Sequence, residues 1–465
     1  MSTELHHGGS MRCRRRLLMV ASAFPPAGGP GVQRCVKFAK YLPRFGWRPI
    51  IWTRDHVDDL PDDSSLLEDL PPDVTVCRHG DDSALRTLQR ALERHACGGG
   101  WTSHAARAAK WRLCAWSSRT QSPDDCVSWA QASIRPLLRL ISHECIDALW
   151  STFSPASNHL LALALKRETQ LPWIADFRDL WTEDYRYCEP STRRRRAHRR
   201  WEREILEFAD VVTGVTDRQT EILSRRSPHA YRKFMTITNG FDEEDFYGMA
   251  PGPAENDPHT PKRRFVLAHV GKLDRWRAND TWLAGLERFV SGLGASGTRF
   301  SFRVVGHVNS QVRKRLAALG AACTFTGYLS HHGAIAEMRS ADALLLPVPD
   351  GPNADSVVPA KTYEYLAAQR PILVVGPNGG ACESLVCACE AGIAVGFDVA
   401  AVEEALGRLY GAWQANAASS VCARPRLARY SRRLLTKELV RVLDHVVDGG
   451  GNSPRPSAVP VPAYA

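Results

Sequence analysis

Short apolar segments alternate with amphipathic helical segments along most of this chain, and this alternation constrains its fold more than any other feature. The first unit has an apolar run at 17–24, a glycine-rich loop, and apolar side chains on one helical face over 32–42. A second apolar run follows at 50–53. Strands that alternate with helices form parallel sheets with helices on both faces. The sequence therefore predicts doubly wound α/β domains.

The same alternation continues in two sets. The first set predicts strands and helices at 128–143, 147–152, 156–168, 172–176, 191–208, 211–215 and 235–238. The second predicts them at 265–270, 301–305, 324–325, 343–346, 360–368, 372–375 and 431–447. Two successive open sheets place a cleft between the domains, at the carboxyl ends of the strands.

Length and composition set the domain organisation. With 465 residues the chain is too long for one core, so two domains of roughly 200 residues each are expected. The expected parts are a disordered tail 1–15, a first domain 16–248 with an irregular insertion 78–130, a Pro/Gly-rich linker 249–262, a second domain 263–430, a final helix 431–448, and a disordered tail 449–465.

Charge and cysteine content indicate the type of partner and the cellular compartment. The net charge of +10 favours anionic partners, and the 13 cysteines include no Cys-x-x-Cys pair, which indicates a reducing cytoplasm. Residues 12–23 imitate a signal peptide, but the glycine-rich turn and helix that follow favour a first buried strand. No apolar run approaches the roughly 20 residues of a membrane-spanning helix.

The segment 358–375 is suited to an anion beside a diol. Lys361 opens a helix, whose first N–H groups attract a diphosphate, and Glu364 follows in the first turn. A carboxylate there can accept two hydrogen bonds from a ribose. A helix–strand unit without a ligand fits the same spacing.

Two cations follow the first strand of the second domain. Gly271 and Lys272 come directly after it, and Arg277 lies five residues beyond Lys272. Cations at a strand end facing a cleft suit a diphosphate and can stabilise a leaving group. A solvated loop is the alternative.

The glycine loop at 28–31 is not a dinucleotide fingerprint. It lacks the G-x-G-x-x-G spacing, and no acidic residue ends the next strand at 52–54, so a nicotinamide enzyme is not expected. The loop either lets a ligand approach the backbone or makes a tight turn.

Charged residues gather at two further places. Asp176, Arg178 and Asp179 end a strand, where they form either an acceptor-hydroxyl site or an ion-paired structural knot. A helical face carries a cluster of arginines: Arg193, Arg194, Arg195, Arg196, Arg199 and Arg200. This face fits an anionic membrane surface or simply faces water; nucleic acid is not expected, because no aromatic platform accompanies it.

Six segments in order carry a family resemblance. They are 24–29 with Arg34 in the helix that follows, 173–181, 237–242, 270–273, 325–328 and 358–366. Over about residues 17–445 the chain resembles family 4-like glycosyltransferases of the GT-B fold, in which two Rossmann-like domains face a cleft. The resemblance implies retaining transfer of a sugar from a nucleotide-diphosphate donor, without a metal ion or a cofactor.

The resemblance also implies roles for residues. Lys272 and Arg277 would hold the diphosphate and Glu364 the ribose. The loop from Asp355 through Ser356, Val357 and Val358 toward Lys361 would lie against the sugar and phosphates, beside Gly271. Gly28 and Gly29 would close over the donor. Asp176, Arg178 and Asp179 would line the acceptor side in the first domain, and the final helix would pack back on that domain.

One position departs from the family pattern. Many relatives carry a glutamate eight residues before Glu364, where this chain has Ser356. The carboxylate that contacts the sugar is therefore missing or supplied by Asp355. No residue is an obvious nucleophile, and in the family's favoured picture the leaving phosphate assists the incoming hydroxyl.

The expected function is sugar transfer to a glycan, lipid-linked or small-molecule acceptor in surface polysaccharide or glycoconjugate assembly. The expected location is the cytoplasm, with peripheral attachment to the inner face of the plasma membrane left open. A nucleotide-sugar epimerase of the same architecture is one alternative. A non-catalytic basic protein that docks on a membrane or nucleic acid is another, and nucleotide binding would distinguish it from the enzyme.

Overall fold

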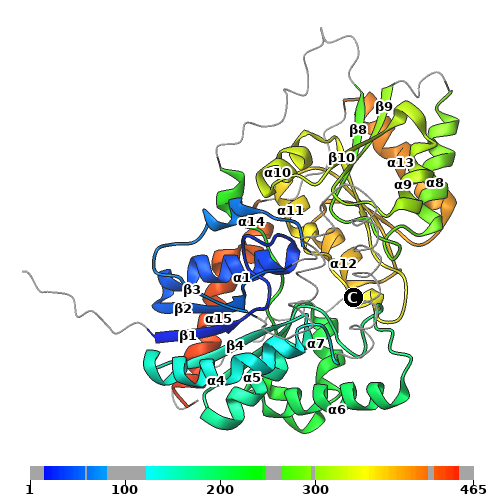
Figure 1. Ribbon diagram of the computed structural model, residues 1–465. Coiled ribbons are helices and arrows are strands. Elements are labelled where there is room, and N and C mark those ends of the chain that lie inside the picture. The colour runs from blue at the N-terminus through cyan, green and yellow to red at the C-terminus, as the bar shows by residue number, and fades with distance from the viewer. Residues whose placement is uncertain are drawn as a thin grey trace, which may run out of the picture.

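The computed structural model describes residues 15–57, 60–80, 122–247, 264–294, 299–416 and 424–449, which form two α/β domains (Figure 1). The expected tails at 1–14 and 450–465, the linker and most of the expected insertion lie outside the described residues.

Within the described residues, seven parallel strands form the first sheet in the order β3-β2-β1-β4-β5-β6-β7. Alternate residues of β1 enter different cores: Leu17 and Met19 one, Leu18 and Val20 the other. Both faces of the sheet are thus buried, as parallel sheets require. The strands are β1 (Arg15–Val20), β2 (Trp47–Arg54), β3 (Thr75–His79), β4 (Ala148–Phe153), β5 (Trp173–Phe177), β6 (Val211–Gly214) and β7 (Phe234–Thr236).

Helices cover both faces of this sheet. The core that contains Leu18 also takes side chains from α4, α5 and α6, whereas the core of Leu17 takes them from α1 and α15. The helices are α1 (Pro30–Tyr41), α4 (Val127–Glu144), α5 (Ala156–Thr169), α6 (Thr192–Phe208), α7 (Asp217–Ser224) and α15 (Arg432–Val447). The last helix therefore returns to the first domain, where Leu435, Leu439 and Leu443 pack with α1.

The second sheet has six described parallel strands in the order β10-β9-β8-β11-β12-β13. They are β8 (Phe265–Val270), β9 (Phe300–Val305), β10 (Cys323–Gly327), β11 (Ala343–Pro347), β12 (Ile372–Val375) and β13 (Gly392–Val395). Helices on one face are α8 (Asp280–Gly292), α9 (Ser310–Ala317) and α13 (Val399–Gln414). Those on the other are α10 (His331–Ser340), α11 (Lys361–Ala368), α12 (Ala381–Ala388) and α14 (Arg424–Leu427).

Both sheets reverse their strand order beside the first strand, between β1 and β4 and between β8 and β11. Ligands of doubly wound folds bind outside the carboxyl ends of strands at this switch point. The loops after these strands therefore form the candidate site. None of the described helices combines the length and apolarity needed to cross a bilayer.

The structure corrects several predicted boundaries. Arg15, assigned to the tail, begins β1 and pairs with Asp444 of α15 at 2.9 Å and with Asp448, the C-cap of that helix, at 2.6 Å. The first strand ends at Val20, four residues before the end of the apolar run, although Ala21 still donates a hydrogen bond to Trp52 O. The expected irregular insertion includes regular structure at both ends, in β3 and in the start of α4. The sequence reading also missed β13 and α13.

Candidate active site

The loop after β8 meets the start of α11, because β8 and β11 are neighbours in the sheet. A Cβ atom built on Gly271 would lie 3.9 Å from Cγ of Lys361 and 3.8 Å from Nε2 of His269. Lys272 is exposed. The structure thus brings together two of the predicted donor-binding segments.

Glu364 is a buried carboxylate beside Lys361. Its Oε2 forms an ion pair with Lys361 Nζ at 2.6 Å, and among the described residues no group donates a hydrogen bond of good geometry to it. Burial alone would raise the pKa of Glu364, yet the positive charge of Lys361 outweighs burial and lowers it. Glu364 is therefore ionised and retains acceptor capacity for a hydroxyl group.

The first N–H groups of α11 are less available than the sequence predicts. Thr362 N donates to Pro359 O at 2.9 Å, and Tyr363 N donates to Ala360 O at 3.3 Å. No side chain caps the helix. Positive charge at this end of α11 therefore comes mainly from Lys361.

Arg277 and His269 lie on the same side of the second sheet. Arg277 Nη1 is 2.9 Å from Asp274 Oδ2, so a nearby carboxylate already offsets its charge. His269 donates from Nδ1 to Leu345 O at 3.1 Å, while its buried Nε2 has no partner. Burial lowers the pKa of His269 to about 4, and the ring is neutral.

The predicted donor loop contacts the first domain. Asp355 Oδ2 lies 2.6 Å from Arg218 Nη2, and Ser356 O accepts a 2.8 Å hydrogen bond from Thr216 Oγ1. Ser356 Oγ donates to Asn353 O at 2.6 Å within its own turn. Both side chains thus already have partners within the protein. Val357 and Val358 follow, with Val358 packed in the second-domain core.

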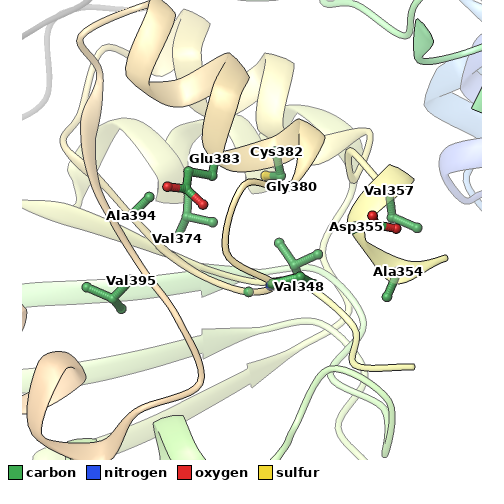
Figure 2. A pocket seen from close by; sticks show the side chains of 12 residues that line it. Val348, Ala354, Asp355, Val357, Val374, Gly380, Cys382, Glu383, Ala394 and Val395 are labelled. Carbon is green, nitrogen blue, oxygen red and sulfur yellow. The ribbon is translucent and has the colours of Figure 1, made fainter. Parts of the chain in front are cut away.

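A small pocket lies at the carboxyl ends of β11, β12 and β13 (Figure 2). Asp355 and Val357 of the predicted donor loop form part of its wall, whereas Lys272, Arg277, Lys361 and Glu364 do not line it. Its lining residues are Val348, Ala354, Asp355, Val357, Val374, Gly376, Pro377, Gly380, Cys382, Glu383, Ala394 and Val395.

The glycine loop of the first domain touches the second domain. A Cβ atom on Gly28 would lie 2.7 Å from Tyr328 Oη, so a larger residue would displace this contact. Tyr328 Oη also donates to Asp63 Oδ2 at 3.2 Å, and burial together with Asp63 raises the pKa of Tyr328 to about 12. Gly29 precedes α1 as its N-cap. The loop therefore contacts the second domain, and its closure over a donor stays a prediction.

Asp176 is the centre of an ion-paired knot, one of the two arrangements that the sequence left open. Arg34 donates to both of its carboxylate oxygens, at 3.0 and 2.7 Å, and Thr152 and Thr213 donate one hydrogen bond each. Both Asp176 and Arg34 are fully buried. Burial would raise the pKa of Asp176, but Arg34 holds it below its usual value. Asp176 therefore positions α1 against the strand ends and does not face the cleft.

Arg178 and Asp179 lie nearer the surface. Arg178 Nη2 donates to Ser154 O at 2.8 Å, and its guanidinium lies so close to Gly31 that a Cβ atom there would collide with it. Arg178 Nε is buried without a partner. Asp179 pairs with Arg186 at 3.1 Å. Arg178 thus sits against the glycine loop and belongs to the cleft.

The sequence reading missed a polar contact between the domains. His331 at the start of α10 donates from Nε2 to Asp245 Oδ2 at 2.8 Å and accepts from Gln33 at 3.0 Å on Nδ1. Asp245 also pairs with Lys37 at 2.6 Å. In the sequence, the only indication of this contact is the pair of histidines at 331–332.

Three carboxylates near this contact are close enough to resemble a metal site. Asp69, Asp242 and Asp245 converge, but Lys37 and Lys40 place their ammonium groups among them at 2.6–2.8 Å. Burial raises the pKa of Asp242, and Lys37 and Lys40 reverse that effect and lower it. The cluster is a structural ion-pair network.

Solved structures with the same architecture cover nearly the whole chain. Sucrose-phosphate synthase from Thermosynechococcus elongatus is similar over 94% of this chain and 100% of its own, with 16% identity and a TM-score of 0.63. HepE from Anabaena, in complex with UDP and glucose, is similar over 92% of this chain and 99% of its own, with 13% identity and a TM-score of 0.60. The fold is GT-B.

The GT-B fold is not restricted to one reaction. A putative UDP-N-acetylglucosamine 2-epimerase from Listeria monocytogenes is similar over 96% of this chain and 100% of its own, with 11% identity and a TM-score of 0.57. No protein-family model matches the sequence, and no curated protein matches it significantly. Function must therefore be argued from the site.

Proposed function

We propose that this GT-B protein transfers a sugar from a nucleotide-diphosphate donor to an acceptor hydroxyl with retention of configuration. The observation that carries the proposal is Glu364, a buried, ionised carboxylate beside Gly271 whose Oε2 is ion-paired with Lys361 and receives no hydrogen bond from the described residues. Such a group accepts hydrogen bonds from the two ribose hydroxyls of a nucleotide. The fold shared with HepE, solved with UDP and glucose, supports the same ligand class.

The diphosphate would lie between the loop after β8 and the start of α11. Lys272 and Lys361 supply positive charge there, and Arg277 adds more when its pair with Asp274 opens. These cations would stabilise the departing nucleotide diphosphate, which leaves with the electron pair of its bond to the anomeric carbon of the sugar. In this proposal they balance the diphosphate charge in place of a metal ion, and no cofactor takes part.

The sugar would lie against the loop formed by Asp355, Ser356, Val357 and Val358. Since the side chains of Asp355 and Ser356 are engaged elsewhere, this loop would present mainly its backbone. The leaving phosphate would accept the proton of the acceptor hydroxyl on the same face of the sugar. Gly28 and Gly29 would close this space from the first domain.

The acceptor would enter from the first domain beside Arg178 and Asp179, whose side chains are 22% and 28% exposed. Asp176 would not contact the acceptor and would act indirectly, by holding Arg34 and α1 in place. A glycan, a lipid-linked sugar or a small molecule fits an acceptor site of this polarity. We assign the reaction to surface polysaccharide or glycoconjugate assembly.

A second candidate is sugar epimerisation, because the epimerase from Listeria monocytogenes shares the architecture. Epimerisation needs acid and base groups that face the sugar. Of the nearby candidates, Asp176 is saturated with hydrogen bonds, His331 bridges Gln33 and Asp245, and the His269 ring is buried and held through Nδ1 by Leu345 O. These contacts favour transfer over epimerisation.

The test is a thermal-shift screen with UDP-, GDP- and ADP-sugars, followed by analysis of the products from the best ligand. Transfer predicts a rise in Tm, slow hydrolysis to free sugar and nucleotide diphosphate, and an α-configured product from an α-configured donor. Conversion to an epimeric nucleotide sugar would establish the second candidate instead. No Tm change with any nucleotide would reject both.

A further inference from the structure

Helix α6 carries a stripe of exposed arginines that sugar transfer does not use. Arg196, Arg199, Arg200 and Arg203 are spaced by three and four residues, so they lie on one face, and all four are exposed. The opposite face is buried and includes His198, Glu202 and Ile205. We call the four exposed residues the arginine stripe.

The charge of the stripe is largely unpaired. Within the described residues, Arg200 pairs with Glu204 at 3.6 Å, whereas Arg196, Arg199 and Arg203 form no ion pair. Arg194, part of the cluster noted in the sequence, is half-buried and lies 3.9 Å from Glu189. Among the described residues, no carboxylate pairs with these three neighbouring positive charges, and an external anion would relieve their mutual repulsion.

Hydrogen bonds and an ion pair on the buried face of α6 hold the helix that carries the stripe. Glu202 accepts hydrogen bonds from Thr182 Oγ1 at 2.6 Å and from Thr182 N at 3.1 Å, and it pairs with Arg226 at 3.2 Å. In Figure 1, α6 lies at the edge of the first domain, away from helices α8 and α9 of the second domain. The arginines are thus held on an outer face of the molecule.

Exposed aromatic residues lie at the carboxyl end of α6. Phe208 ends the helix and is 44% exposed, with the Arg167 guanidinium 4.7 Å above its ring. Tyr231 is 61% exposed and belongs to the turn that Lys233 ties to the same helix end through Glu207 O and Ala209 O. Aromatic rings beside cations are typical of surfaces that contact the headgroup region of a bilayer.

We propose that the arginine stripe of α6 docks the protein on an anionic membrane surface. A bilayer offers a flat, dense array of negative charge, and a straight helix can present all its cations to one plane. Nucleic acid fits less well, because single-strand binding needs bases stacked along the basic face. Trp201, which lies between Arg200 and Arg203 in the sequence, is only partly exposed and packs against the core.

Co-sedimentation with vesicles tests the proposal. The full-length protein is mixed with phosphatidylcholine vesicles that contain about 30 mol% phosphatidylserine, and with vesicles of phosphatidylcholine alone. Each arginine near such a surface strengthens binding by roughly fivefold, so the triple variant R196S/R199S/R203S should bind about 100-fold more weakly. Binding of the wild type should weaken when NaCl rises from about 0.1 to about 0.5 M.

Two matched variants control for folding and for total charge. R196K/R199K/R203K keeps the charge and should still sediment. R288S/K314S/R408S removes three exposed cations from the second domain and should bind like the wild type. The proposal is overturned if the wild type does not sediment with anionic vesicles, or if the two triple-serine variants lose binding equally. It is also overturned if the stripe binds a mixed-sequence oligonucleotide and not the vesicles.

Discussion

Arg218 and Asp355 form an ion pair across the two domains, with 2.6 Å between Nη2 and Oδ2. The same guanidinium donates to Gly379 O at 3.2 Å. Arg218 thus holds two segments of the second domain that border the pocket in Figure 2, and one of them is the proposed donor loop. The position of the first domain is therefore coupled to the shape of that loop.

Replacing Arg218 with alanine should raise KM for the donor about fivefold, because the loop loses its contact with the first domain. Stability should change by less than about 1 kcal/mol, since the pair is partly exposed. Initial rates against donor concentration measure the effect. Arg225→Ala, which removes an exposed pair at the other end of α7, is the control. Equal KM values for the two variants would contradict the role of Arg218.

Replacing Asp176 with asparagine should lower the free energy of unfolding by about 3–5 kcal/mol, because Arg34 would keep a buried charge without its counterion. Urea unfolding measures the loss. Glu221→Gln, in an exposed pair with Arg225, should cost less than about 1 kcal/mol. A stable Asp176→Asn variant that loses only acceptor binding would instead place Asp176 in the cleft.

Removing both cations after β8, in the variant K272S/R277S, should lower kcat at saturating donor at least about 100-fold, because the departing diphosphate loses its stabilisation. Arg275→Ser changes a charge on the same loop that lies over Trp276, and should have little effect. A normal kcat in the double variant would exclude both residues from leaving-group stabilisation.

The neutral, buried His269 makes stability depend on pH. Its pKa is about 4 in the folded protein, against about 6.5 when unfolded, so the unfolded chain binds more protons between these values. The free energy of unfolding should therefore fall by about 3 kcal/mol as pH drops from about 6.5 to about 4, and this term should be constant above pH 6.5.

The variant His269→Gln, which keeps a donor for Leu345 O, isolates this contribution. Urea unfolding of the wild type and the variant across this pH range should give curves that diverge in slope below about pH 6.5. His143→Gln, on the exposed surface of α4, should follow the wild type. Parallel curves for the wild type and His269→Gln would show that the ring does not titrate as inferred.

Most of the two sheets was predictable, because buried parallel strands appear as apolar runs between helical segments. The proximity of Glu364 to Lys361 was also predictable, since the two residues are three positions apart on one helix. The contacts of Arg218, Tyr328 and His331 were not, because they depend on how the two domains are placed relative to each other. No local pattern in the chain encodes that placement.

Other positions needed the structure to decide between two readings. Asp176 ends a strand whether it forms an acceptor site or an ion-paired structural cluster. Only its burial with Arg34 shows that it belongs to the structural cluster. Ser356 stands where relatives carry a glutamate, and only the structure shows that its hydroxyl closes its own turn. The basic face of α6 includes Arg203, which lies outside the run of consecutive arginines, and excludes the half-buried Arg194, which lies within it. The periodicity of the helix decides which arginines share this face.

The most direct test of the account is calorimetric titration of the best nucleoside diphosphate into the wild type, Glu364→Ala and Glu383→Ala. Glu383 lines the pocket in Figure 2 and lies outside the proposed ribose site. The account predicts that Glu364→Ala weakens binding about 10- to 100-fold, through the loss of hydrogen bonds to a charged acceptor, while Glu383→Ala stays within about twofold. Unchanged affinity in Glu364→Ala, with a loss in Glu383→Ala, would contradict it.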